Sequence, residues 1–515
     1  MKNAILVTVF VSACTGEMMS PPSSSTAGGG EPSSTAGGGA TATAGGGNGA
    51  AGGTTATAGG GVAPIPGPPG CGLTAAAFCD TFDAPVQGTA RAKELDGRRW
   101  SLSRVWGALT TAMTIGPATV TNCRGGLPAR VYPPNDTLVC DPTAGIASRH
   151  LLVAAAAQNY GTHALRIRRP FDFAGRTGKI VLDTDATSAN DLVGWLSVSV
   201  TDEPIGSPSF SQIPGAGNSE GGIIPKNGVE VHLMTCPQAQ LPSARISSIH
   251  EFRSYADHLH RYVEGGPCIR TQRDRLNRLE LRLSQSRIEV WGTNFSADGT
   301  TFDAPILLGS ANLGLTFTRG YVHLTTHNHA SMKYSNDTID AVVTRWDNVG
   351  FDGPVIDDAV EFEVPDALVS SGANQVDVGW LVPLANKPEK RVVTLRGVEV
   401  TGATSARLAF TMQYLQNAFG DADFSLYGLE YKLNGGPVHR SMLTAGERAL
   451  LESGVVLQGD AAGEANPVIW GALGQVLTVP VSELRAGDNT LEIAIIGVPD
   501  HIPATLANID LIVGR

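Results

Sequence analysis

The stretches from Arg278 to Leu283 (RLELRL) and from Arg287 to Trp291 (RIEVW) decide the fold class of this chain. In both, apolar residues alternate with charged or aromatic ones. Side chains on a β-strand point to opposite faces at every second residue. The leucines therefore share a face that packs on a core, and the charged residues share the face toward water. The pattern predicts two half-buried strands joined by a short turn.

The rest of the chain shows the same kind of pattern. Residues 178–183 (GKIVLD), 194–200 (GWLSVSV) and 228–233 (GVEVHL) are rich in β-branched or aromatic residues and are bounded by turn formers. Helices are predicted only at 444–452, where Thr444 can cap and Glu447 follows three residues later, and in a short piece from Ser254 to Tyr262. We therefore predict an all-β protein with two jelly-roll or β-sandwich domains.

Seven cysteines divide into one plus six. Cys14 follows a short apolar run behind a positively charged start, which is typical of a secretory signal and too short to span a bilayer. The sequence Val11-Ser-Ala-Cys14 resembles the lipobox of bacterial lipoproteins. The resemblance implies a signal peptide at 1–13 and a lipid on Cys14. The alternative is an ordinary signal peptide cleaved nearby.

The other six cysteines would then meet an oxidising compartment, where disulfides form and persist. Six cysteines allow many connectivities, and the sequence alone does not choose among them. Neighbours along the chain suggest three pairs: Cys71 with Cys79, Cys123 with Cys140, and Cys236 with Cys268. Zinc is disfavoured, because the chain has no C-x2-C pair.

Residues 14–70 form the predicted tether. From Pro21 to Pro69 the chain is almost wholly Ser, Thr, Ala, Gly and Pro, with TAGGG repeated, so it cannot bury a core and is expected to be disordered. A net charge of −11 argues against a nucleic-acid partner. No later stretch is apolar enough for a membrane span. Any membrane contact is therefore expected through the lipid alone, at the bacterial cell envelope, with the outer membrane or cell surface favoured.

Several short stretches resemble the strands of concanavalin A-like jelly rolls of the laminin G or laminarinase type. They are residues 78–85 (FCDTFDAP), 95–100 (LDGRRW), 279–292 and 344–353 (TRWDNVGFDG). The resemblance implies such a domain over residues 71–353, stapled by the three disulfides. It also permits calcium, which occurs in many of these domains. No acidic spacing specifies calcium, so no cofactor is predicted.

The cysteine-free segment 355–515 is predicted to be a second sandwich. Residues 477–493 (LTVPVSELRAGDNTLEI) and 508–513 (NIDLIV) resemble the jelly-roll modules of carbohydrate-binding and galactose-binding-like domains. Gly487 can take a positive φ, and Asp488 and Asn489 favour turns. This motif is therefore predicted to be a folding device.

Catalytic candidates are few. Laminarinase-type hydrolases use two glutamates on one strand as nucleophile and acid, and this chain lacks the E-x-D-x-x-E pattern. Glu230 and His232 share one strand face without a second carboxylate. Glu361-Phe-Glu363 is predicted to mark a solvated strand face.

Nine of the eleven histidines fall between His150 and His329. The pairs His258-x-His260 and His327-x-His329 each put two imidazoles on one face, where they could bind a metal or where one could act as a base. Surface histidine beside the sheet is the favoured interpretation. The candidate catalytic set is therefore Glu230, His232, His327 and His329, and the four paired histidines are weak metal candidates. Asn328 and Tyr334 are placed at the rim of a ligand groove.

A basic signal lies between Arg261 and Arg287, where there are seven arginines. The candidate ligand-binding residues Arg278, Arg282 and Arg287 could pair the acidic groups of an anionic glycan while Trp291 stacks on a sugar ring. Neighbouring glutamates offset part of this charge. A strand face turned to water is the simpler interpretation.

The sequence therefore predicts a cell-envelope lipoprotein that binds a polysaccharide or other glycan without catalysis. The first alternative is a secreted glycoside hydrolase or polysaccharide lyase. The second is a structural or adhesive envelope protein. The fold does not separate these, because function depends on the site.

Overall fold

The structure is a computed structural model. Its described residues belong to one compact unit within residues 60–515. They are 70–86, 94–105, 123, 137–143, 145–155, 162–185, 194–204, 207–212, 219–224, 227–236, 243–254, 257–261, 266–272, 275–296, 301–328, 342–364, 391–416, 423–452, 456–457, 470–499 and 505–515. The predicted signal peptide, Cys14 and the tether lie outside this part of the chain.

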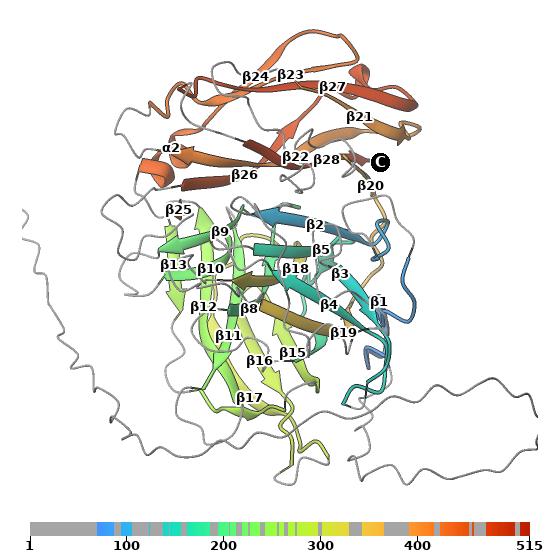
Figure 1. Ribbon diagram of the computed structural model, residues 1–515, viewed down its shortest axis with the longest axis vertical. Helices are drawn as coiled ribbons and strands as arrows, with labels where there is room; N and C mark the ends of the chain where they lie inside the picture. Colours follow the sequence, from blue (N-terminus) through green and yellow to red (C-terminus); the bar gives the residue numbers. More distant parts are fainter. Residues whose placement is uncertain are drawn as a thin grey trace, which may run out of the picture. The chain divides into compact units, whose positions relative to one another are not determined.

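The first sandwich consists of two antiparallel sheets (Figure 1). The eight-stranded sheet contains β17 (Ile306–Asn312), β16 (Arg287–Gly292), β15 (Asn277–Leu283), β7 (Gly178–Thr184), β19 (Val342–Asp352), β4 (His150–Ala155) and β3 (Thr137–Cys140), with β1 (Ala76–Asp80) paired to β19. The nine-stranded sheet contains β13 (Asp257–Arg261), β12 (Ser243–Ser254), β11 (Gly228–Thr235), β8 (Gly194–Thr201), β18 (Arg319–Asn328), β5 (Thr162–Ile167) and β2 (Trp100–Val105) in that order, with β14 (Ile269–Arg270) and β6 (Phe171–Asp172) at the side.

One apolar core fills the space between these two sheets. The alternation that opens the sequence works as predicted: Leu279, Leu281 and Leu283 are buried in the core while the charged residues between them face outward. From the other sheet, Val198 and Leu324 are among the residues that enter the same core. The core therefore occupies one face of each sheet and leaves the outer faces to carry other chemistry.

The second sandwich begins after Asp352. One sheet has the order β20 (Ala359–Glu363), β28 (Thr505–Gly514), β22 (Ser405–Gln416), β26 (Trp470–Thr478), and the other has the order β21 (Arg391–Val398), β27 (Gly487–Ile496), β23 (Gly428–Leu433), β24 (His439–Met442). A second apolar core lies between them. A small third sheet joins β10 (Ser219–Ile224), β9 (Ser207–Gln212) and β25 (Val456–Leu457). These elements confirm the all-β fold class.

The two helix predictions had opposite outcomes. Helix α2 (Ala445–Glu452) has the expected capping box, because the Thr444 N–H donates to Glu447 Oε2 at 2.7 Å and the Glu447 N–H donates to Thr444 Oγ1 at 3.3 Å. The helix predicted from Ser254 to Tyr262 was wrong, since β13 occupies most of it and pairs with β12. So short a segment gains little from helical bonds, and the ladder of a neighbouring strand offers more.

The three predicted disulfides are present: Cys71–Cys79, Cys123–Cys140 and Cys236–Cys268. The Gly-Asp-Asn motif is a folding device, as predicted. Gly487 has a φ of 91°. The buried Asn489 accepts from the Arg485 N–H at 2.9 Å and donates to the Arg485 carbonyl at 2.7 Å, which closes the turn into β27. No helix among the described residues is long and apolar enough to cross a membrane.

Candidate functional site

The outer face of the nine-stranded sheet, called the polar face below, carries polar side chains in two rows. The strand register places six residues side by side in the first row: His250, Glu230, Ser199, His323, Arg166 and Ser101, on β12, β11, β8, β18, β5 and β2. The second row contains Ser248, His232, Ser197, Thr325, Ala164 and Ser103. Neighbouring members of a row are about one strand spacing apart, roughly 4.8 Å.

The polar face exists because these strands alternate. In β8 the residues Leu196, Val198 and Val200 enter the core, so Ser197 and Ser199 point the other way. The same holds for the other strands that carry the rows. The predicted pairing of Glu230 with His232 on one face is correct, and both residues belong to these rows.

Glu230 is held by two neighbours. Its Oε1 accepts a hydrogen bond from Ser197 Oγ at 2.7 Å, and its Oε2 lies 3.2 Å from His232 Nε2. The His232 ring meets the His250 ring edge to face, with centroids 5.1 Å apart. All of these side chains are buried. The Glu230 carboxylate is therefore held by protein groups away from solvent.

The hydrogen bonds of His323 reveal its tautomer. Thr201 Oγ1 donates its one proton to the Glu203 carbonyl at 2.6 Å, so it must accept from His323 Nε2–H at 2.9 Å. His323 Nδ1 is then the acceptor nitrogen. Burial, and to a smaller extent the charge of Arg166, lowers the pKa of His323 well below its ordinary value of 6.5. The imidazole is neutral at physiological pH.

Three polar atoms near His323 have no hydrogen-bond partner among the described residues. They are Ser199 Oγ, Thr325 Oγ1 and Arg166 Nη1, and all three are buried. Buried polar groups are almost always hydrogen-bonded, because leaving one unpaired costs about 1–3 kcal/mol. Water or a ligand hydroxyl at this position would satisfy them.

Arg166 also forms ion pairs with two carboxylates of the second sandwich. Its Nη2 donates to Glu361 Oε1, and the same atom lies 3.9 Å from Asp510 Oδ2. Next to it on the chain, Arg168 pairs with Glu363 at 3.2 Å. The prediction that Glu361-Phe-Glu363 is a solvated strand face was therefore wrong. Both carboxylates are buried because arginines of β5 and the turn after it compensate their charge.

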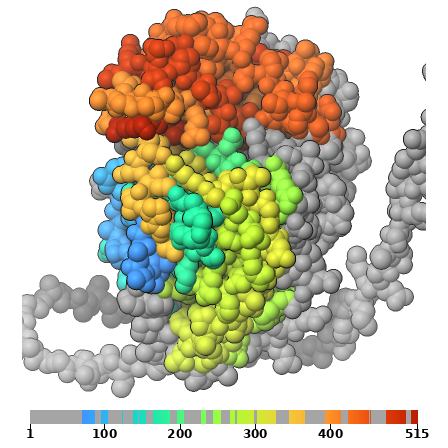
Figure 2. Space-filling view, turned by 180° about the vertical axis from the view of Figure 1, so that it is seen from behind, coloured from blue at the N-terminus to red at the C-terminus, as the bar shows by residue number. Residues whose placement is uncertain are grey.

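The predicted arginine and tryptophan patch lies on the opposite side of the first sandwich, on the eight-stranded sheet. Residues of β15–β17 form a continuous yellow-green to yellow part of the surface in Figure 2. Each predicted arginine has a carboxylate partner: Arg278 pairs with Asp183, Arg282 with Glu280, and Arg287 with Glu289. The Arg282 guanidinium covers the Trp291 ring at 4.6 Å from its centroid. An anionic glycan would have to displace these partners.

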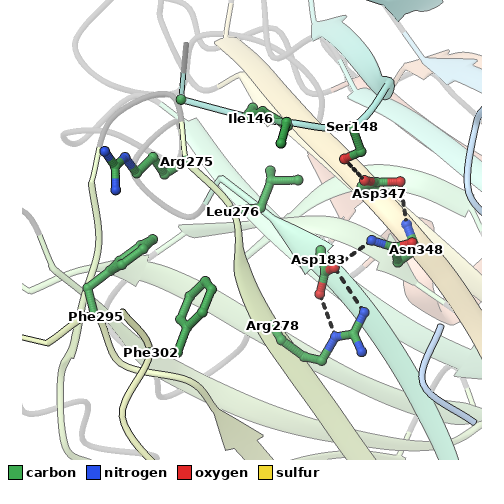
Figure 3. Close-up of a pocket in the computed structure, with 12 residues that line it drawn as sticks. Ile146, Ser148, Asp183, Arg275, Leu276, Arg278, Phe295, Phe302, Asp347 and Asn348 are labelled. Carbon is green, nitrogen blue, oxygen red and sulfur yellow. Dashed lines mark hydrogen bonds and ion pairs between the residues drawn. The ribbon is translucent and has the colours of Figure 1, made fainter. Parts of the chain in front are cut away.

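A second polar cluster, carried by the central strands β15, β7 and β19 of the eight-stranded sheet, surrounds a small cavity (Figure 3). Asp183 accepts two bonds from Arg278, at 2.7 and 2.9 Å, and one from Asn348 Nδ2 at 2.7 Å. Asp347 accepts bonds from Ser148 Oγ and from the Asn348 N–H. Burial raises the pKa of Asp347 to about 7 despite these bonds. The cavity, about 30 Å³, has room for water but not for a sugar.

A wider cavity, about 640 Å³, adjoins Tyr321 and Glu361. Two of the arginines that line it cap the free edge of β1: Arg169 Nη1 donates to the Ala77 carbonyl at 2.7 Å, and Arg99 Nη2 donates to the Cys79 carbonyl. Guanidinium groups placed on an edge strand block the addition of another strand. These two arginines therefore protect the fold, and they are poorly available to an anion.

The remaining predicted site residues fall at the limits of the described part. His258 and His260 lie on β13, and His327 and Asn328 end β18, but the side chains of these four residues are outside the described residues. His329 and Tyr334 lie outside them altogether. Among described residues no group of three or more His, Cys, Asp or Glu side chains gathers as metal ligands would. No calcium or zinc site is assigned on them.

No family model and no curated protein matches the sequence. Among solved structures, a glycoside hydrolase family 16 endo-glucanase from Bacteroides ovatus is 11% identical with a TM-score of 0.30, covering 53% of this chain and 99% of that one. A family 16 glycosyl hydrolase from Mycobacterium smegmatis is 12% identical with a TM-score of 0.26, covering 54% and 99%.

The exoplasmic/lumenal domain of VIP36, bound to Ca²⁺ and Man2, is 12% identical with a TM-score of 0.26, covering 53% of this chain and 88% of that one. Likenesses at these values carry no argument about function.

Of the two rows, Glu230 and His232 were predicted as site residues, whereas Ser199, His323 and Arg166 were not. A signal for them was present, because polar residues alternate with apolar ones in both GWLSVSVT (194–201) and YVHLT (321–325). Alternation shows that a strand has a polar face. It does not show which strands lie next to one another.

Proposed function

We propose that this protein binds a polysaccharide through the polar face and does not cleave it. The observation that carries the proposal is the pair of cross-strand rows, in which hydroxyl and imidazole groups repeat at the spacing of the strands. Sugars are recognised by convergent hydrogen-bonding groups of this kind. The unpaired hydroxyls of Ser199 and Thr325 support it further.

The carboxylates of the polar face argue for binding rather than hydrolysis. Glycoside hydrolysis commonly needs two carboxyl groups about 5 to 10 Å apart. Among its described side chains, the sheet itself supplies one carboxylate to this face, that of Glu230. The next carboxylate, Glu361, is tied to Arg166, three strands further along the row. A retaining or inverting pair is therefore not formed by these residues.

A glycan array with the mature chain, followed by product analysis on every positive glycan, tests the proposal. A binder retains its ligand and releases neither reducing ends nor unsaturated products. Replacing Glu230 by Gln removes the charge and keeps an acceptor, so binding is expected to weaken without any change in products. Release of new chain ends that stops in the Glu230→Gln protein would instead establish a hydrolase or lyase.

If the protein binds no glycan on the array, the proposal is contradicted and a structural or adhesive role remains. A matched control is Ser284→Ala in the exposed turn between β15 and β16, which lies on the other sheet. Its glycan binding is expected to equal that of the unchanged protein. The comparison separates loss of the site from a general loss of folding.

We also propose that Cys14 carries a lipid that anchors the protein at a bacterial cell envelope. The proposal rests on the sequence preceding Cys14, and one acyl chain alone gives only marginal anchoring, so several chains are expected. Mass spectrometry of the N-terminal peptide and detergent partitioning of a Cys14→Ser protein test it. An unmodified Cys14 in the mature protein would contradict it.

A further inference from the structure

The wider cavity is lined by both sandwiches and has room for a ligand. The first sandwich contributes residues of β1, the turns at 97–99 and 168–170, and Tyr321 of β18. The second contributes residues 356–361, Glu399 and Ile512. The volume of about 640 Å³ lies within the range of small-molecule sites, about 300–1,000 Å³. No member of the two rows of the polar face lines this cavity, so it is a separate place on the molecule.

The charges of this lining balance one another. Four arginines stand against four carboxylates: Arg98, Arg99, Arg168 and Arg169 against Asp357, Asp358, Glu361 and Glu399. Several of them are also compensated from outside the cavity, since Arg168 pairs with Glu363 and Asp358 pairs with Arg319. A charged ligand would lose hydration on entry and gain little net attraction in return. The lining therefore favours a ligand without charge.

The lining disfavours two other classes of ligand. Arg169 and Arg99 already donate to carbonyls on the free edge of β1, so an extended peptide cannot pair with that edge. A hydrocarbon would remove water from charged side chains and offer them nothing in exchange. Apolar groups are present too, from Pro170, Ile356 and Val360. A ligand that suits both kinds of group has hydrogen-bonding groups around an apolar frame, as a sugar has hydroxyls around its C–H faces.

Three side chains of the lining have hydrogen-bonding capacity to spare. Asp357 Oδ1 lies 3.8 Å from Arg169 Nη2, which is too far for a hydrogen bond. The Asp357 carboxylate makes no hydrogen bond with any described residue, and its side chain is 82% exposed. The Tyr321 hydroxyl makes none with a described residue either, although Tyr321 is only 8% exposed. A sugar hydroxyl that accepts from Arg169 and donates to Asp357 would bridge the gap between them.

We propose that the wider cavity binds an uncharged sugar, as a mono- or disaccharide unit, with its hydroxyls bonded to Arg169, Asp357 and Tyr321. This inference goes beyond the proposed function, because it assigns a second sugar site in a different place from the polar face. It stands or falls independently of polysaccharide binding at that face.

A panel of small sugars with matched charges tests the inference. Glucose, galactose, mannose, maltose, cellobiose and lactose are titrated against the mature protein by isothermal titration calorimetry. Each hexose that binds is compared with its uronic acid and its 2-amino derivative, which place a negative or a positive charge on the same ring. Both charged forms are expected to have a Kd roughly tenfold higher or more. Equal or tighter binding of a charged form overturns the inference.

Substitutions in the lining give an independent readout. Ala76→Trp adds a large side chain at the exposed first residue of β1 and removes no contact, so it is expected to weaken sugar binding roughly tenfold or more. Ala304→Trp, at an exposed alanine outside the cavity, is the matched control and is expected to bind normally. Tyr321→Phe keeps the ring and removes the free hydroxyl, so binding is expected to weaken about three- to tenfold.

Asp357→Asn tests the charge argument directly. It leaves the lining with one more arginine than carboxylates, so the uronic acid is expected to gain affinity relative to the neutral hexose. Thermal unfolding of every variant shows whether the fold persists. Unchanged sugar binding by both Ala76→Trp and Tyr321→Phe overturns the inference.

The Glu230→Gln protein separates this site from the polar face. Sugar binding that is lost in Glu230→Gln but kept in Ala76→Trp and Tyr321→Phe overturns the inference and supports the proposed function. The reverse pattern supports the inference. If no neutral sugar of the panel binds, the inference is overturned, while the array of polymeric glycans still decides the proposed function.

Discussion

Replacing Asp347 by Asn is expected to make the protein more stable at neutral and alkaline pH. Asp347 accepts hydrogen bonds from Ser148 and the Asn348 N–H, but burial outweighs them and raises its pKa to about 7. In the unfolded chain the pKa is near 3.8. Because the folded pKa is the higher one, the stability contributed by the protonated form is complete below about pH 4 and is lost as the pH rises through about 7.

The magnitude follows from the size of the shift. A difference of about 3 pH units corresponds to roughly 4 kcal/mol, since one unit is worth about 1.4 kcal/mol. An asparagine keeps an acceptor for the Asn348 N–H, and its amide can donate to Ser148 in place of accepting from it. The variant is therefore expected to match the unchanged protein near pH 4 and to exceed it by up to about 4 kcal/mol near pH 8.

Urea unfolding at a series of pH values measures this difference, with tryptophan fluorescence as the signal, to which the buried Trp346 contributes. Asp423→Asn is the control, because hydrogen bonds from Ser425 lower the pKa of the exposed Asp423 and leave it no titration between about pH 5 and 8. A gap between Asp347→Asn and the unchanged protein that stays constant with pH would refute the reasoning. So would a variant that is less stable at about pH 8.

Three further predictions concern stability. Removing the Cys236–Cys268 disulfide is expected to cost about 4 kcal/mol by the loop-entropy estimate, since it closes a separation of 32 residues, and calorimetry of the double serine variant measures the loss. Asn489→Ala leaves four hydrogen bonds unmade in a buried turn, so the free energy of unfolding should fall by about 3 kcal/mol or more; a loss below about 1 kcal/mol would show that the turn does not depend on them. Thr444→Ala removes the cap of α2 and should cost about 1 kcal/mol, with Ser284→Ala as an exposed hydroxyl control.

Local patterns predicted a large part of the fold. The alternation in residues 278–291 led to the correct strands and the correct faces, because the side-chain period of a strand is a property of the backbone. The cap at Thr444 and the turn at Gly487 were predictable for the same reason, since each depends on residues a few positions apart. The disulfides also joined near neighbours along the chain.

The two errors had different causes. Ser254 to Tyr262 looked helical in isolation, but most of it became a strand beside β12. Glu361 and Glu363 were predicted to face water, but both are buried, in ion pairs with Arg166 and Arg168. β12 directly precedes β13 in the chain, so the first error lay in the choice of period within a local hairpin. Arg166 and Arg168 are each 195 residues from the glutamate they contact, so no local pattern could have predicted those pairs.

The amino-acid sequence determined which residues of each strand face a core, where one helix starts, and that Glu230 and His232 share a face. Tertiary structure alone decided that His250, Glu230, Ser199, His323 and Arg166 stand in one row and that Glu361 and Asp510 of the second sandwich reach Arg166. The reason is physical: alternation is set by bonds within a strand, whereas a row across a sheet is set by the register between strands such as β5 and β18, whose partners Arg166 and His323 are 157 residues apart in the chain (323 − 166).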